Sequence, residues 1–187
     1  MGQYYTPIIK RNNGTFATFY SHDYANGLKL MEHSYVGNIF VDTVAKQLYN
    51  NPSRLAWIGD YAESDDNFNG SDLSVFIKES QEEARELKHR RKPMPTNGDF
   101  LENKFIVNVS KNEYIDMNKY AQEAPLDRWI ETPIHPLPIL TAVGNGRGGG
   151  DYHGEDSMVG YWAGDTIVVS DNKPSGTDIT EDCYFEE

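Results

Sequence analysis

The glycine-rich stretch GNGRGGGDYHGED, residues 144–156, is the part of the chain best suited to hold a ligand. It contains six glycines, one arginine, one histidine and three carboxylates. Glycine reaches positive φ angles without steric cost, so this composition is typical of a loop and not of a packed core. Such a loop is able to cradle a phosphate, to bind a metal ion or simply to turn the chain.

Two known phosphate-binding patterns fit this loop only in part. A P-loop requires Gly-x-x-x-x-Gly-Lys-Ser/Thr before a helix, and no Lys-Ser or Lys-Thr follows here. Gly144, Gly146 and Gly149 match G-x-G-x-x-G, but the residues that follow are poor helix openers and no βαβ unit is present. An anion nest of backbone N–H groups at Gly146, Gly148 and Gly149 beside Arg147 stays open as an alternative to a purely structural loop.

Metal binding and nucleophilic catalysis have less support. The chain has five histidines but no H-E-x-x-H or H-x-H spacing, and its single cysteine excludes a cysteine-based zinc cluster. Cys183 lies among carboxylates, which disfavour a nucleophilic thiolate. The pairs Asp65–Asp66 and Glu155–Asp156 lie in polar stretches, where neighbouring acids are usually solvated. We therefore predict no catalytic residue, no metal and no cofactor.

One ligand-binding alternative remains beside this prediction. In it, the glycine loop, Arg147 and His153 gather with His22 or His33 around a phosphate or a metal ion. The protein would then be a small nucleotide- or metal-binding protein or a hydrolase. This alternative requires residues far apart in the sequence to converge.

The charge is distributed unevenly along the chain. The net charge is −12, from 29 acidic and 17 basic residues. Residues 1–150 carry 19 acidic and 16 basic side chains, net −3, whereas residues 151–187 carry 10 acidic side chains and only Lys173, net −9. An excess of this size repels free nucleic acid and attracts a basic partner at long range.

Aromatic side chains accompany several of the acidic stretches. Tyrosine and tryptophan often anchor protein interfaces, because each combines a large apolar area with a polar tip. An acidic surface that carries aromatics is suited to a basic protein or ribonucleoprotein. The predicted partner-binding residues are Tyr61, Asp65, Asp66, Asp151, Tyr152, Glu155 and Asp156.

The local patterns predict an α+β fold with a mixed or antiparallel sheet built from hairpins and two main helices. One main helix is expected to follow an N-cap at Asn38 and to run until Pro52. The other is expected over residues 73–91, with Ser71 or Asp72 as its N-cap, and a short helix is expected at 118–124. Hairpins are expected at 3–10 with 15–20 and at 104–109 with 113–117. Further strands are expected at 28–31, 54–59, 134–143 and, singly or as a pair, within 157–171.

The chain length suits one domain, residues 1–187, with an acidic and loosely held C-terminal tail at about 171–187. No run of about 18 apolar residues is present, so we expect no association with a membrane. The single cysteine fits a reducing compartment. These features predict a cytoplasmic protein.

Four segments of the sequence resemble small proteins of phages and mobile elements in gut bacteria: NGLKLMEHSYVGNIFVDTV, WIGDY, GNGRGGGDY and VGYWAGDTI. Proteins of this size, origin and acidity include type II-A anti-CRISPR inhibitors. The resemblance implies a non-enzymatic inhibitor of a nucleic-acid-handling defence nuclease, such as a guide-loaded type II CRISPR nuclease, whose basic channels hold nucleic-acid backbones. It carries over no inhibitor residue, because no functional motif matches.

Overall fold

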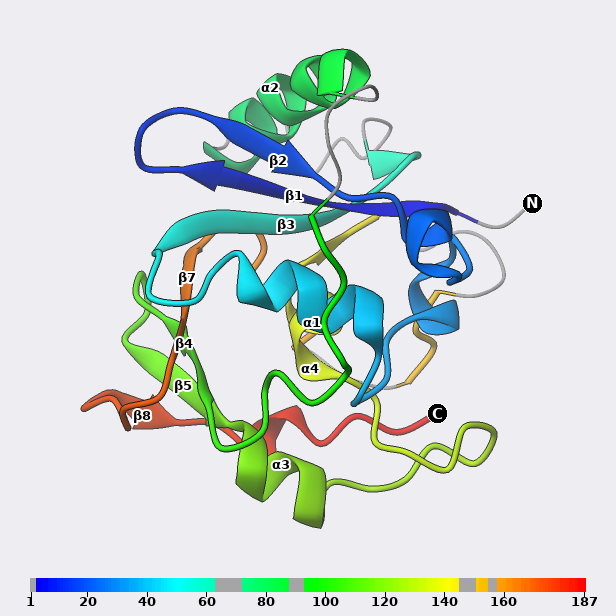
Figure 1. The fold of residues 1–187 in the computed structure, drawn as a ribbon, viewed down its shortest axis with the longest axis vertical. Helices are drawn as coiled ribbons and strands as arrows, with labels where there is room; N and C mark the ends of the chain where they lie inside the picture. Colours follow the sequence, from blue (N-terminus) through cyan, green and yellow to red (C-terminus); the bar gives the residue numbers. More distant parts are fainter. Residues whose placement is uncertain (1–2, 63–71, 88–92, 145–150, 155–157) are drawn as a thin grey trace.

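The computed structural model describes residues 3–62, 72–87, 93–144, 151–154 and 158–187. These residues form an α+β domain in which helices pack against one mixed, eight-stranded sheet (Figure 1). The strand order is β2-β1-β3-β7-β4-β5-β8, and β6 pairs with β3 beside this path. The predicted fold class is confirmed. None of the helices in the described ranges has the length and apolar character needed to cross a lipid bilayer.

The bounds of the elements follow the chain order. The strands are β1 (Tyr5–Arg11), β2 (Phe16–Thr18), β3 (Ser53–Gly59), β4 (Phe105–Asn108), β5 (Glu113–Asp116), β6 (Ala142–Val143), β7 (Thr166–Ser170) and β8 (Thr177–Asp178). The helices are α1 (Ile39–Lys46), α2 (Asp72–Leu87), α3 (Met117–Glu123) and α4 (Pro136–Leu140). Short 3-10 turns occupy Ser21–Tyr24, Leu30–Glu32 and Glu181–Cys183.

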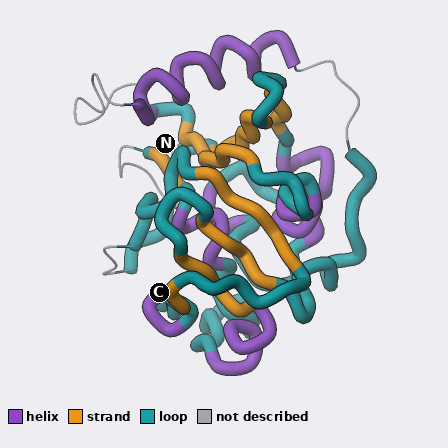
Figure 2. Tube along the Cα trace, turned by 90° about the vertical axis from the view of Figure 1, so that its left-hand side faces the viewer, coloured by secondary structure: helices purple, strands orange, loops and turns teal. Residues whose placement is uncertain are grey.

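The antiparallel strands β1 and β3 separate two apolar layers. Their side chains alternate between the two faces, as the two-residue period of a strand requires. Ile9 and Trp57 point into the main core with α1 and α4, whereas Ile8 and Ile58 pack against Phe76 of α2. In Figures 1 and 2 the helix α2 therefore lies on one side of these strands, and α1 lies on the other.

The edge of β3 that faces away from β1 is shared by two strands. Its first residues, Ser53 and Arg54, pair antiparallel with β7, and its later residues, Trp57 and Ile58, pair parallel with β6. Between these pairings Leu55 exchanges backbone hydrogen bonds with the turn that precedes β7. The sheet is thus forked at β3, and the glycine-rich stretch begins where β6 leaves the fork.

The three predicted helices are present, but α1 ends at Lys46 instead of reaching Pro52, and residues 88–91 of the second predicted helix lie outside the described residues. Capping explains where α1 begins. The side-chain oxygen of Asn38 accepts hydrogen bonds from the backbone N–H groups of Phe40 (2.8 Å) and Val41 (3.2 Å). Asparagine is favoured at this position because it satisfies N–H groups that have no partner within the helix. The Asn38 amide also donates to the Asn26 side chain at 2.6 Å, which fixes the preceding loop to the helix.

The prediction of a strand at 28–31 is wrong, because residues Leu30–Glu32 of this segment form a 3-10 turn. The Glu32 side chain accepts a hydrogen bond from the Lys29 N–H, and the Ser34 hydroxyl donates to the Leu30 carbonyl. Local side-chain bonds of this kind give the backbone an alternative to pairing in a sheet.

The strand expected at 134–143 is confirmed only at its end, as β6. His135 caps the short helix α4, and Pro136 occupies its first turn. Proline suits that position because its fixed φ is helical and its missing N–H would have no partner there. The segment 157–171 likewise contributes one strand, β7, and residues 158–165 form turns.

The C-terminal segment 171–187 is not loosely held, in contrast to the expectation from its acidity. Ile179, Cys183 and Phe185 are buried in the main core. Its strand β8 pairs in parallel with β5. Three apolar anchors in a short stretch outweigh the solubility of its carboxylates, so the segment is an integral part of the domain.

The Asn38 cap should make a measurable contribution to stability. We expect Asn38→Ala to lower the free energy of unfolding by about 1–2 kcal/mol, because it leaves two N–H groups without an acceptor. Urea titration followed by circular dichroism measures this change. Asn118→Ala, at an exposed site in α3, is the matched control and should change stability by less than about 0.5 kcal/mol. An equal loss in both variants would contradict the role of the cap.

Candidate functional site

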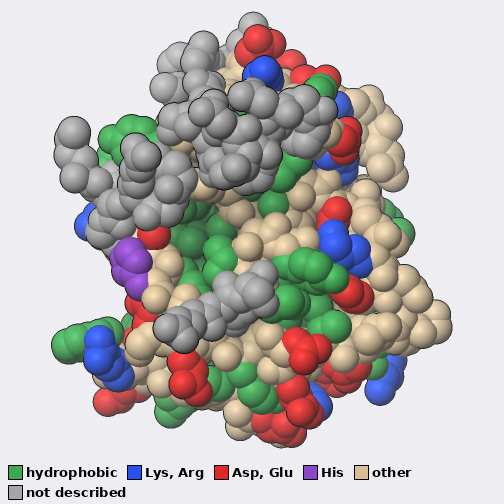
Figure 3. Space-filling model, turned by 180° about the vertical axis from the view of Figure 1, so that it is seen from behind, with side chains coloured by type: hydrophobic (Ala, Val, Ile, Leu, Met, Phe, Trp, Pro, Cys, Tyr) green, Lys and Arg blue, Asp and Glu red, His purple; other side chains and the backbone are tan. Residues whose placement is uncertain are grey.

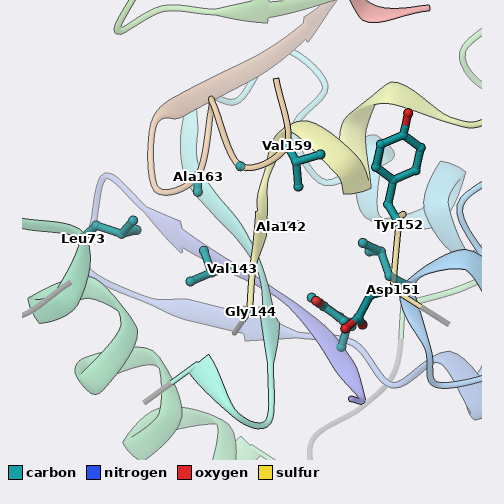
Figure 4. Close-up of a pocket in the computed structure, with 11 residues that line it drawn as sticks. Leu73, Ala142, Val143, Gly144, Asp151, Tyr152, Val159 and Ala163 are labelled. Atoms are coloured by element: carbon teal, nitrogen blue, oxygen red, sulfur yellow. The ribbon is translucent and has the colours of Figure 1, made fainter. Parts of the chain in front are cut away.

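A cavity of about 270 Å³ lies where β6 leaves the fork of the sheet. It is smaller than the sites of about 300–1,000 Å³ that hold drug-sized ligands. Figure 4 shows Leu73, Val143 and Ala163 on one side of it, with Asp151 and Tyr152 on the other. Its walls are otherwise apolar or made of backbone, and the remaining lining residues are Tyr5, Leu30, Ala142, Gly144, Val159 and Gly160.

Two glycines allow the walls of the cavity to approach each other. A Cβ atom at Gly144 would lie 2.4 Å from the Tyr5 hydroxyl oxygen, which is closer than van der Waals contact permits. Gly160 has a φ of +73°, and a Cβ atom there would lie 2.7 Å from the Ala142 carbonyl oxygen. The backbone conformation at Gly160 therefore favours glycine, whereas a larger residue at Gly144 would have to displace the ends of the Tyr5 and Gln3 side chains.

Asp151 is the charged group of the cavity. The Asp151 residue is only 5% exposed, and neither of its carboxylate oxygens accepts a hydrogen bond from a described residue. The Tyr5 hydroxyl approaches the Asp151 carboxyl, and its interaction with the carboxylate favours the charged form and partly offsets the effect of burial. Burial raises the pKa of the Asp151 carboxyl. Burial and the Asp151 charge also raise the pKa of the Tyr5 hydroxyl.

The predicted partner-binding residues that the structure describes have different surroundings. Tyr61 follows β3 and is 37% exposed, as an interface residue requires. Tyr152 is half-buried, its hydroxyl donates to the Glu186 carbonyl at 3.0 Å, and its ring meets Phe185 edge-on. Asp151 is not on an exposed face, since it is buried in the cavity wall. The expectation of an exposed carboxylate at position 151 is corrected accordingly.

The other predicted site residues lie outside the described residues. These are Asp65, Asp66, Glu155 and Asp156 of the acidic set, and Gly146, Arg147, Gly148 and Gly149 of the alternative anion nest. Their roles stay predictions. The two described ends of the glycine loop, Gly144 and Asp151, both line the cavity.

The described histidines do not gather into a metal site. Within the described ranges no group of three or more His, Cys, Asp or Glu side chains is placed to hold a metal ion. His22 is exposed and stacks on Tyr20, whereas His33 is fully buried. His153 is exposed beside the C-terminal segment, where its backbone N–H donates to the Glu187 carboxylate at 2.7 Å.

His33 and His135 are buried structural groups. The Nδ1 atom of His33 lies 3.0 Å from the Gly27 carbonyl, and its Nε2 atom accepts a hydrogen bond from the Trp57 indole at 2.9 Å. This assigns a neutral ring with the proton on Nδ1. His135 accepts from the Leu137 N–H through Nδ1, and its buried Nε2 has no partner among the described residues. Burial lowers the pKa to about 4 for His33 and to about 3 for His135.

A second feature is the set of exposed carboxylates on the C-terminal segment, which we name the acidic rim. The rim comprises Asp171, Asp178, Glu181, Asp182, Glu186 and Glu187. Seen from behind in Figure 3, carboxylates gather along the end of the molecule that lies opposite α2. The charge count alone located this feature.

Sequence reasoning did not find the cavity. Its walls come from β1, β6, α2, the 3-10 turn Leu30–Glu32 and the segments 151–152 and 159–163, which are distant in the sequence. The only local signal is a glycine directly after a short apolar strand, at Gly144. Comparison of the chain with known proteins gives no match to a protein-family model, to a curated protein or to a solved structure.

The buried histidines should make the fold sensitive to acid. A histidine in the unfolded chain titrates near 6.5, above the folded values, so between pH 6.5 and 4 the unfolded chain binds more protons. The free energy of unfolding therefore falls as the pH falls through this window. His135→Asn keeps a capping acceptor but cannot titrate, so it should reduce this slope by about 1.4 kcal/mol per pH unit.

Urea titrations at pH 7, 6, 5 and 4 measure the slope. The buried Asp42, whose pKa is raised to about 6, changes stability in the opposite direction, but it does so in both proteins and cancels in the comparison. His22→Asn, at an exposed histidine, is the control and should match the unmodified protein. Identical slopes for His135→Asn and the unmodified protein would show that His135 does not oppose protonation.

Proposed function

We propose that the protein is a non-enzymatic inhibitor that binds a basic protein or ribonucleoprotein through the acidic rim. The observation that carries this proposal is that the rim stands on a segment anchored in the core. Carboxylates on such a segment have fixed positions. A partner therefore does not have to order a flexible tail, which lowers the entropic cost of binding.

Hydrogen bonds reinforce the apolar anchors of the rim. The Ile179 N–H donates to the Tyr114 carbonyl at 3.0 Å, and the Asp116 N–H donates to the Thr180 hydroxyl at 3.0 Å. The buried Tyr120 hydroxyl lies 2.8 Å from both the Cys183 and the Ile134 carbonyl oxygens. These contacts hold both ends of the 3-10 turn that carries Glu181 and Asp182.

Part of the rim is neutralised within the molecule and part is available to a partner. Asp171 pairs with Lys104 at 3.4 Å, and Glu181 pairs with Lys119 at 2.5 Å. Asp182 and Glu186 form no ion pair within the described part of the chain. These two carboxylates are thus the part of the rim best placed to attract a basic surface.

The resemblance to phage and mobile-element proteins suggests which basic partner to test first. A guide-loaded type II CRISPR nuclease holds nucleic-acid backbones in positively charged channels. A set of exposed carboxylates on an anchored segment is complementary in charge to such a channel, and electrostatic complementarity mainly raises the association rate. In this proposal the protein competes with nucleic acid for the channel and transforms no substrate.

Charge reversal on the rim tests the proposal. We expect Asp182→Lys with Glu186→Lys to slow association with the guide-loaded nuclease by about tenfold at low salt, because the steering field is lost. Surface-plasmon resonance at low and high salt measures the rate constants. The difference should shrink at high salt, where exposed charges are screened.

The matched control places the same charge change on α2, at the other end of the molecule. Glu82→Lys with Glu83→Lys should slow association by less than about twofold. Equal slowing by the two double variants would mean that only net charge matters and would refute a role specific to the rim. Absence of binding by the unmodified protein at low salt would refute this choice of partner.

A further inference from the structure

We propose that the cavity at the end of β6 is a binding site for a small organic ammonium compound, with Asp151 as the group that receives its charge. This site is separate from the acidic rim and does not depend on the partner proposed above. The ligand class follows from the Asp151 carboxyl, from the apolar walls and from the size of the cavity.

The first step of the argument is the Asp151 carboxyl itself. A buried carboxylate without hydrogen-bond donors loses its hydration and gains nothing in exchange, which costs free energy. Both Asp151 oxygens are in that state with respect to the described residues, and the residue lines the cavity. A donor group bound in the cavity would supply the missing partner.

The second step is the sign of the charge. The described residues that line the cavity include no lysine or arginine. Next to Asp151, His153 lowers the pKa of its carboxyl and Asp60 raises it, but neither residue lines the cavity. The Asp151 carboxylate favours a cation and opposes a phosphate or a carboxylate. An anionic ligand is therefore less suited to the cavity than a cationic one.

The third step is shape. Leu30, Val143 and Val159 give the cavity apolar walls, and its volume of about 270 Å³ limits the ligand to a compact molecule. An ammonium group on a short aromatic or aliphatic body meets both conditions. The ammonium group would face Asp151 and Tyr5, and the body would pack on the apolar side chains.

Titration with small probes tests this site. We expect 2-phenylethylamine to shift the amide resonances of Gly144 and Gly160 saturably in ¹H–¹⁵N spectra. The anion 3-phenylpropionate, which has a similar apolar body, and inorganic phosphate should not shift them. Equal shifts from the amine and the anion, or shifts from phosphate, would overturn the proposed charge preference.

Two variants complete the test. Asp151→Asn should weaken amine binding at least about tenfold while the melting temperature stays the same or rises, because a buried unpaired charge is removed. Glu82→Gln, an exposed carboxyl on α2, should change neither quantity. Ala163→Leu keeps Asp151 but fills the cavity, and it should also abolish binding. A melting temperature several degrees lower in Asp151→Asn, or unchanged amine affinity in either cavity variant, would overturn the proposal.

Discussion

Burial of β3 on both faces is the constraint on which the rest of the structure depends. Trp57 is fully buried on one face, and its indole donates to His33, which in turn contacts the Gly27 carbonyl. On the other face Ile58 packs in the layer under α2. Because β3 also pairs with β1, β6 and β7, its position fixes the fork of the sheet and the point where β6 ends at Gly144.

The sequence allowed prediction of those elements whose signals are local. Three predictions were correct because capping, turn geometry and strand alternation act over a few residues. They are the helix after Asn38, the hairpin turn that follows β1 and the strand at Arg54–Gly59. The strand predictions failed at 28–31 and over most of 134–143. In the first segment local side-chain hydrogen bonds override strand propensity, and in the second a helix cap and proline do so. The acidic tail was misjudged because composition does not show that three apolar residues share one buried side.

The two candidate sites also differ in how far the sequence predicts them. The acidic rim follows from a charge count and needed the structure only to show that its backbone is anchored. The cavity depends on the meeting of Tyr5, Leu73 and Asp151, which lie in three distant parts of the chain. No periodicity or spacing connects such residues. A buried carboxylate whose oxygens accept no hydrogen bond from the described residues is a departure from the rules that stabilise a fold, and departures of this kind concentrate at functional sites.

The rim and the cavity share one structural element, yet their roles can be separated. Tyr152 lines the cavity, and its hydroxyl donates to the backbone carbonyl of Glu186 at the end of the rim. Because that contact uses the backbone, reversing the Glu186 charge leaves it in place and does not disturb the cavity wall. Conversely, Asp151→Asn changes no exposed charge of the rim. Loss of steering and loss of amine binding are therefore independent results, and either proposal stands or falls without the other.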